Sequence, residues 1–113
     1  MLIIAVILFL FAAALGLVIL TAVLEDRKTN KKILYIHGIV AIIALVLMII
    51  DIALFGRGSL VILSLILFIL AALGGLTMFT LDMQKKPVPK WLALIHPVVA
   101  LAGLIALVAY ILP

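Results

Sequence analysis

Four long apolar runs dominate the sequence and restrict what the chain can fold into. They cover residues 2–24, 33–55, 60–81 and 91–112. A helix needs about 20 apolar residues to cross a hydrocarbon core about 30 Å thick, and each run meets that length. We therefore expect an all-α fold, an integral membrane four-helix bundle in which residues 1–113 form a single transmembrane domain.

The composition excludes a soluble domain. Of 113 residues, 71% are hydrophobic and 11% are charged. A domain of this size leaves much of its surface in water, so it cannot bury that much apolar area. A cleaved signal peptide is the alternative for residues 2–24, but this run has no basic leader and exceeds the roughly 7–15 apolar residues of such peptides. The chain has no cysteine, which excludes disulfides, thiolate metal sites and c-type haem attachment.

The cations predict the orientation. Seven of the eight Lys and Arg residues lie in two connections, residues 25–32 and 82–90, and Arg57 lies in the turn between them. Short loops rich in Lys and Arg remain in the cytoplasm. We therefore expect a bacterial inner membrane protein with both basic loops in the cytoplasm and both termini outside. The net charge of +4 forms no long basic face, so we expect membrane lipid and not nucleic acid as a partner.

The two halves of the sequence resemble each other. Lys31 and Lys90 lie 59 positions apart, as do His37 and His96. A weaker similarity links residues 13–16 with residues 71–74. This pattern predicts an internal repeat of residues 1–55 and 60–113, in which two helical hairpins with the same orientation are related by a pseudo-two-fold axis along the membrane normal.

His37 and His96 are the only histidines, and each lies just inside an apolar run. An ionisable side chain at such a depth is a candidate functional residue because it needs a partner in hydrocarbon. The repeat predicts that the two imidazoles lie at similar depth and face each other. Small residues share their helix faces or their depth, and they would give clearance to a flat ligand: Ala41, Ala44, Ala100, Gly103, Gly16 and Gly74. Small residues are also typical of close helix packing in membranes.

Four interpretations of the histidine pair are open. Bis-histidine ligation of one haem b needs only two neutral imidazoles, His37 and His96, as axial ligands of the haem iron. Lys32 and Lys90 would then receive the propionates at the cytoplasmic interface. A zinc site normally requires three or four protein ligands. A proton relay and a structural role, with each imidazole hydrogen-bonded to the backbone, are the other two interpretations.

Four apolar helices with histidines on the second and fourth resemble the small membrane-bound b-type cytochromes. The resemblance covers the whole chain and is architectural. It implies electron transport through haem, with quinol or a redox partner protein as the exchange partner. Many bacterial four-helix members carry four histidines for two haems, whereas this chain has two. The resemblance therefore implies at most one bis-histidine haem in each subunit.

Asp51 is the second unusual residue, because it lies on the His37 face near the outer end of its run, with Tyr110 at the equivalent repeat position. Together they are candidates for a quinol or proton site, and pairing of Asp51 with Arg57 is the alternative. Two further functional hypotheses remain. The chain could be a structural or accessory subunit of a larger membrane complex, or a homodimer. A small proton-coupled exporter is the third choice, and the sequence identifies no enzyme substrate.

Overall fold

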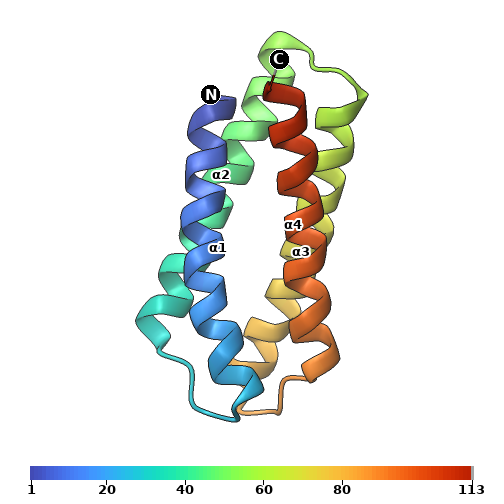
Figure 1. Cartoon of the computed structure of the whole chain (residues 1–113). Coiled ribbons are helices and arrows are strands. Elements are labelled where there is room, and N and C mark those ends of the chain that lie inside the picture. Colours follow the sequence, from blue (N-terminus) through green and yellow to red (C-terminus); the bar gives the residue numbers. More distant parts are fainter. Residues whose placement is uncertain (113) are drawn as a thin grey trace.

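Four helices make up the fold. The structure, a computed structural model, describes residues 1–112. The helices are α1 (Leu2–Leu24), α2 (Lys31–Phe55), α3 (Ser59–Met83) and α4 (Lys90–Ile111) (Figure 1). Each one is long and apolar enough to cross a membrane. The predicted all-α fold is confirmed, and each helix coincides with one apolar run.

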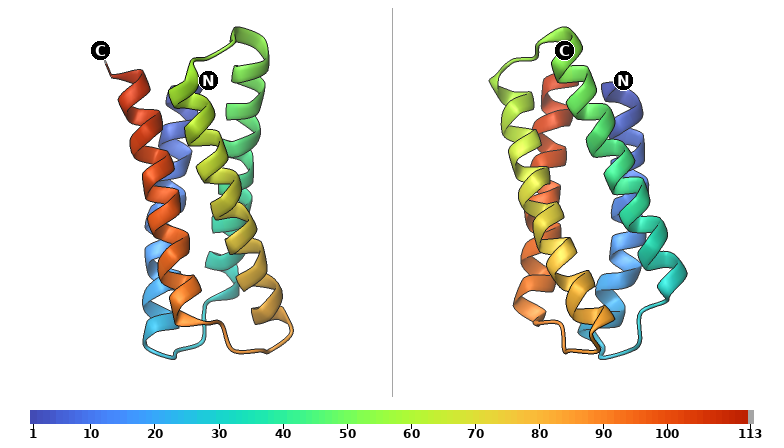
Figure 2. Two further views of the ribbon diagram at one scale, coloured as in Figure 1. Left: turned by 90° about the vertical axis from the view of Figure 1, so that its right-hand side faces the viewer. Right: turned by 180° about the vertical axis from the view of Figure 1, so that it is seen from behind.

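The helices run alternately up and down in a bundle with extents of 42 × 23 × 21 Å. Both termini and the turn between α2 and α3 lie at one end, and the two basic loops lie at the other (Figure 1). Within each hairpin, α1 packs along α2 and α3 packs along α4. The hairpins meet through α1 and α4, whereas α2 and α3 contact each other much less (Figure 2).

Helix α2 begins two residues before its apolar run. The Asn30 side chain accepts hydrogen bonds from the backbone N–H groups of Lys32 and Ile33, at 2.9 and 3.4 Å. This N-cap satisfies backbone donors that have no partner inside the helix, so α2 begins at Lys31, before its first apolar residue. Lysine tolerates this position because its long side chain can carry the charge out to the interface.

The first helix of each hairpin ends in the same backbone turn. Asp26 and Lys85 both have φ of 57°, in the left-handed region that residues other than glycine rarely adopt. In each turn the next residue returns its N–H to a carbonyl five positions earlier, which is the hydrogen bond of a Schellman motif. These bonds run from Arg27 to Ala22 at 2.8 Å and from Lys86 to Leu81 at 2.9 Å.

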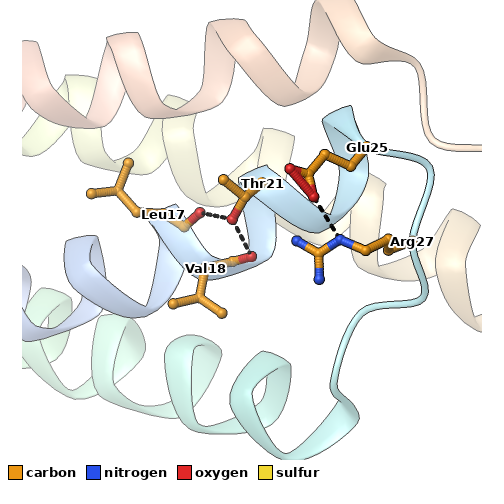
Figure 3. A network of polar contacts seen from close by, with 5 residues as sticks. All are labelled: Leu17, Val18, Thr21, Glu25 and Arg27. Carbon is orange, nitrogen blue, oxygen red and sulfur yellow. Dashed lines mark hydrogen bonds and ion pairs between the residues drawn. The ribbon is translucent and has the colours of Figure 1, made fainter.

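The polar groups at the end of α1 are satisfied locally, as Figure 3 shows. The Thr21 hydroxyl lies 2.8 Å from the carbonyl of Leu17 and 2.9 Å from that of Val18. The Arg27 Nε atom donates to the Glu25 carboxylate at 2.7 Å. A threonine that bonds to its own helix exposes no unsatisfied hydroxyl. This end of α1 can therefore sit at an apolar boundary without a partner from another helix.

The core is small and lies between the hairpins. Phe9 of α1 and Phe68 of α3 stack with their ring centroids 3.8 Å apart and their planes at 4°. Beyond this stack, towards the termini, Val61, Met48 and Leu107 are fully buried. Most of the other large apolar side chains point outward on all four helices, which is the reverse of the pattern in a soluble domain.

Candidate functional site

The two histidines lie next to each other in the half of the bundle that ends in the basic loops. His37 comes from the second turn of α2 and His96 from the second turn of α4. Their ring centroids are 6.3 Å apart and their planes lie at 79°. Helices from two different hairpins thus bring together the two side chains that the sequence singles out.

One nitrogen of each imidazole is bound to the backbone. Nδ1 of His37 lies 2.7 Å from the carbonyl oxygen of Ala12. Nδ1 of His96 lies 2.7 Å from the carbonyl oxygen of Ala71. Because a carbonyl oxygen only accepts, Nδ1 carries the proton of each neutral ring. Nε2 therefore keeps its lone pair, which is the arrangement typical of histidines that bind a metal through Nε2.

A glycine lies against each imidazole. A Cβ atom added at Gly16 would lie 3.1 Å from Cε1 of His37, and one added at Gly75 would lie 3.1 Å from Cε1 of His96. Gly74, which we expected to match Gly16, lies farther away, because its Cβ would be 3.9 Å from Nδ1 of His96. Gly75 was not predicted from the sequence, because the similarity between residues 13–16 and residues 71–74 corresponds to a shift of 58 positions. A shift of 59 positions, which relates the two histidines, aligns Gly16 with Gly75.

A cavity of about 410 Å³ lies beside the histidines. All four helices line it, and the surface is almost entirely apolar. Phe9 and Phe68 line it from the core, and Thr29 and Val88 line it from the two basic loops. Ligand pockets of about 300–1,000 Å³ are typical for small molecules and cofactors. The cavity therefore has the size and the polarity of a site for a bulky apolar ligand.

The small residues that were predicted to leave room for a flat ligand fall into two groups. Ala41, Ala100 and Gly16 line the cavity. Ala44 is fully buried in the core. A Cβ atom at Gly103 would lie 3.3 Å from the Ser64 carbonyl oxygen, and the Ser64 hydroxyl donates to the Gly103 carbonyl at 2.6 Å. Gly103 and Ala44 therefore serve close helix packing.

Ion pairs between the two hairpins flank the loop end of the cavity. Lys31 of α2 pairs with Asp82 of α3. Lys90 of α4 pairs with Asp26 in the loop after α1, at 3.2 Å. Lys90, one of the two predicted propionate partners, thus already has a carboxylate partner, and Lys32 lies in the first turn of α2. Lys31, Lys90 and Asp26 are exposed, whereas the Asp82 side chain is only 28% exposed and lines the cavity. Water therefore screens the pair of Lys90 with Asp26 more than the pair of Lys31 with Asp82.

Asp51 and Tyr110 lie at the opposite end, far from the histidines along the bundle. Asp51 is fully buried and accepts two hydrogen bonds from Arg57, from Nε at 2.6 Å and from a terminal nitrogen at 3.0 Å. The Asp51 carboxylate and, less strongly, the Tyr110 hydroxyl raise the pKa of the Arg57 guanidinium above its ordinary value. Arg57 thus neutralises the charge of Asp51, as the structural alternative predicted.

The ligand count argues against a zinc site of protein side chains alone. Within residues 1–112, no three His, Cys, Asp or Glu side chains lie close enough together to bind one ion. A structural zinc site uses four protein ligands and a catalytic site usually three. Two histidines suit a metal whose other ligands come from a cofactor.

Comparisons with protein-family models, with curated proteins and with solved structures find no match to this chain. Any function must therefore be inferred from the geometry of the histidine site.

Proposed function

We propose that the protein is an integral membrane b-type cytochrome that holds one haem b between His37 and His96. The observation that carries this proposal is the pair of imidazoles. They come from two hairpins, each has its Nδ1–H bound to a carbonyl, and their centroids lie 6.3 Å apart beside an apolar cavity.

The spacing of the imidazoles fits one iron between them. A bond from an imidazole nitrogen to a first-row metal is about 2 Å long, so two imidazoles on opposite sides of one iron have ring centroids about 6 Å apart. The observed 6.3 Å agrees with that value. The angle of 79° between the rings is compatible, because an imidazole can rotate about its bond to the metal.

The tautomer and the cavity favour haem over a bare ion. Axial imidazoles must be neutral with a free nitrogen lone pair, and the carbonyls of Ala12 and Ala71 select that form. The porphyrin needs a largely apolar space, which the cavity provides. When bound, haem supplies one-electron transfer, and the chain contributes the ligands and the apolar surroundings that tune its potential.

The apolar outer surface supports the membrane location. Large hydrophobic side chains are exposed on every helix, and the long dimension of 42 Å matches a bilayer of about 40–45 Å including its headgroups. The distribution of cations further supports an orientation with the basic loops in the cytoplasm and both termini outside. The haem would lie near the cytoplasmic side, so a quinol or a redox partner protein must complete any path across the membrane.

Matching contacts support the proposal that the bundle is a repeat of two parallel hairpins. The hydrogen bond from His37 to Ala12 recurs 59 positions later as the bond from His96 to Ala71. The left-handed residues Asp26 and Lys85 are also separated by 59 positions. A repeat of this kind explains how two imidazoles reach one site with equivalent surroundings.

The test is an absorption spectrum of the purified protein before and after reduction with dithionite. We expect a shifted Soret band with sharp α and β bands, and we expect His37→Ala and His96→Ala each to abolish them. Trp91→Ala is the control, because Trp91 is exposed on α4 and should leave the spectrum unchanged. Pure, folded protein from haem-supplied cells that shows no visible bands would exclude the cytochrome function.

An accessory subunit of a larger complex is the second candidate. The observation in its favour is that each histidine already links the two helices of its own hairpin through Nδ1. In that case the histidine variants would lower stability without any haem spectrum, and the exposed apolar faces would bind partner subunits or a second copy. An exporter has less support, because Asp51 is paired with Arg57 at the helix end.

A further inference from the structure

The cavity beside the histidines reaches the outer surface along the sides of the bundle. The residues that both line the cavity and are exposed are Ala13, Leu17, Ile42, Ala72 and Leu101. Each of them lies well inside a helix and not in a loop. A residue that lines a cavity and is also exposed marks a place where the cavity meets the surface. The cavity therefore opens between helices and not at the ends of the bundle.

The openings lie at the two seams between the hairpins. Ala13 and Leu101 come from α1 and α4, which form one seam, and Ala72 and Ile42 come from α3 and α2, which form the other. The shift of 59 positions relates Ala13 to Ala72 and Ile42 to Leu101, so the two openings are equivalent in the repeat. Helices α2 and α3 contact each other much less than α1 and α4 do (Figure 2). We therefore expect the opening between α2 and α3 to be the wider one.

The end of the cavity at the basic loops is covered. The Tyr35 ring of α2 packs edge-on against Phe79 of α3, with ring centroids 5.8 Å apart, and its hydroxyl lies 3.9 Å from the Met83 sulfur. One turn before Tyr35, Lys31 pairs with Asp82. Among the described residues that line this end of the cavity, none is exposed. The stacked phenylalanines of the core close the other end.

We propose that the ligand of this cavity enters from the lipid phase through the side openings, mainly between α2 and α3, and not from water at the basic loops. This inference rests on the proposed membrane location and haem site, because it names the route by which that site is loaded. In a bundle that spans a membrane, Ile42 and Ala72 face hydrocarbon. Hydrocarbon is costly for a hydrated ion to cross. The route therefore excludes a free metal ion and admits a molecule that dissolves in the bilayer, such as a porphyrin that enters by an apolar edge.

The experiment follows the uptake of haem b by the protein, freed of haem and reconstituted in phospholipid vesicles that contain haem b in the same membrane. The rate at which the low-spin absorption bands appear measures entry. Ala72→Trp places a bulky side chain at the opening between α2 and α3, and Ala13→Trp places one at the other opening. We expect Ala72→Trp to slow uptake by about twofold or more and the double variant by about tenfold or more, because the helices must then part before haem enters. Ala13→Trp should have the smallest effect of the three, because the wider opening stays free.

Matched controls lie at the next positions on the same helices. Ala14 and Leu73 are exposed and do not line the cavity, so Ala14→Trp and Leu73→Trp should take up haem at the rate of the unmodified protein. A second control closes the loop end. Asp26 and Lys90 form an ion pair between the hairpins at 3.2 Å, and linking Asp26→Cys to Lys90→Cys with a short bismaleimide should leave the rate unchanged.

The final absorption spectrum separates a blocked route from a damaged site. Slower uptake that ends in the unmodified spectrum supports the inference. If a tryptophan variant loses the final spectrum, the smaller substitutions Ala13→Leu and Ala72→Leu replace it in the same measurement. An unchanged rate in the double variant, or uptake stopped by the link at the basic loops, would overturn the inference and leave the cytochrome function intact. Failure of the unmodified protein to take up haem b would overturn both proposals.

Discussion

Phe9 and Phe68 stack face to face at 3.8 Å, and their contact separates the cavity from the packed core. They come from the first helices of the two hairpins, 59 positions apart. On the terminal side of the stack the bundle is filled by Met48, Val61 and Leu107. On the side of the basic loops, the cavity opens, and Ala12, Ala41, Ala71 and Ala100 are among the residues that line it.

The stack should contribute to the association of the hairpins. Phe68→Leu and Phe9→Leu each replace a buried ring by a smaller side chain, which removes packing contacts and leaves a void in the core. We expect each variant to lower the unfolding free energy by about 1 kcal/mol or more, measured by denaturation with SDS in mixed micelles. Phe11→Leu is the matched control, because Phe11 is exposed on α1. Equal unfolding free energies for all three variants would show that the stack does not contribute to the association of the hairpins.

Gly75 should be essential to the position of His96. A methyl group at Gly75 would lie 3.1 Å from Cε1 of His96, closer than an ordinary contact, so the ring must shift and strain its bond to Ala71. We expect Gly75→Ala to weaken haem binding and alter the absorption spectrum. Gly74→Ala, with a contact at 3.9 Å, should leave both nearly unchanged. If Gly74→Ala proves the more damaging, the glycine that supports His96 has been identified incorrectly.

Arg57 should be required for the stability of the fold, because it is the partner of the buried Asp51 carboxylate. Arg57→Gln removes the guanidinium that donates two hydrogen bonds to the carboxylate and leaves a buried charge without its partner. We expect a clear fall in the melting temperature, larger than that of Lys28→Gln in the exposed loop. The double variant Asp51→Asn/Arg57→Gln should recover part of the loss. The two side chains are not coupled if the double variant loses as much stability as Asp51→Asn and Arg57→Gln lose when their separate effects are added.

Replacement of Lys85 by glycine should stabilise the protein. Its φ of 57° is unfavourable for a residue with a Cβ atom by about 1–2 kcal/mol, although glycine gives part of this back through greater freedom when unfolded. We expect Lys85→Gly to raise the unfolding free energy by up to about 1 kcal/mol. Lys86→Gly, at the next position, should give no gain because its φ is not positive. A destabilised Lys85→Gly variant would contradict this account of the turn.

Labelling of single cysteines can test the orientation, because the chain has no cysteine of its own. Gln84→Cys lies at the end with the basic loops, and Gly58→Cys lies in the opposite turn. Both substitutions keep every cation. We expect a thiol reagent that cannot cross membranes to label Gly58→Cys in cells with a permeable outer envelope and to label Gln84→Cys only after the inner membrane is broken. The reverse labelling pattern would show that the basic loops lie outside the cytoplasm.

The hydrogen bonds and contacts around the histidines could not be read from the sequence. Carbonyl oxygens exist at every residue, so nothing in the sequence marks those of Ala12 and Ala71 as the partners of His37 and His96. The helices in each hairpin must adopt a particular rotation before these atoms meet. The same rotation places Gly75, and not Gly74, against the imidazole.

The sequence by itself determined the four helices and the equivalent positions of the two histidines in the second turns of α2 and α4. Both are local properties, because an apolar run of about 20 residues determines a helix long enough to span a membrane, and the distance of a histidine from the start of that run determines its place along the helix. Only the tertiary structure decided that His37 and His96 approach to 6.3 Å, that a cavity opens beside them and that Asp51 is bound by Arg57. These properties depend on how residues distant in the chain pack together, and Leu-rich helices can pack in many ways with similar apolar contacts.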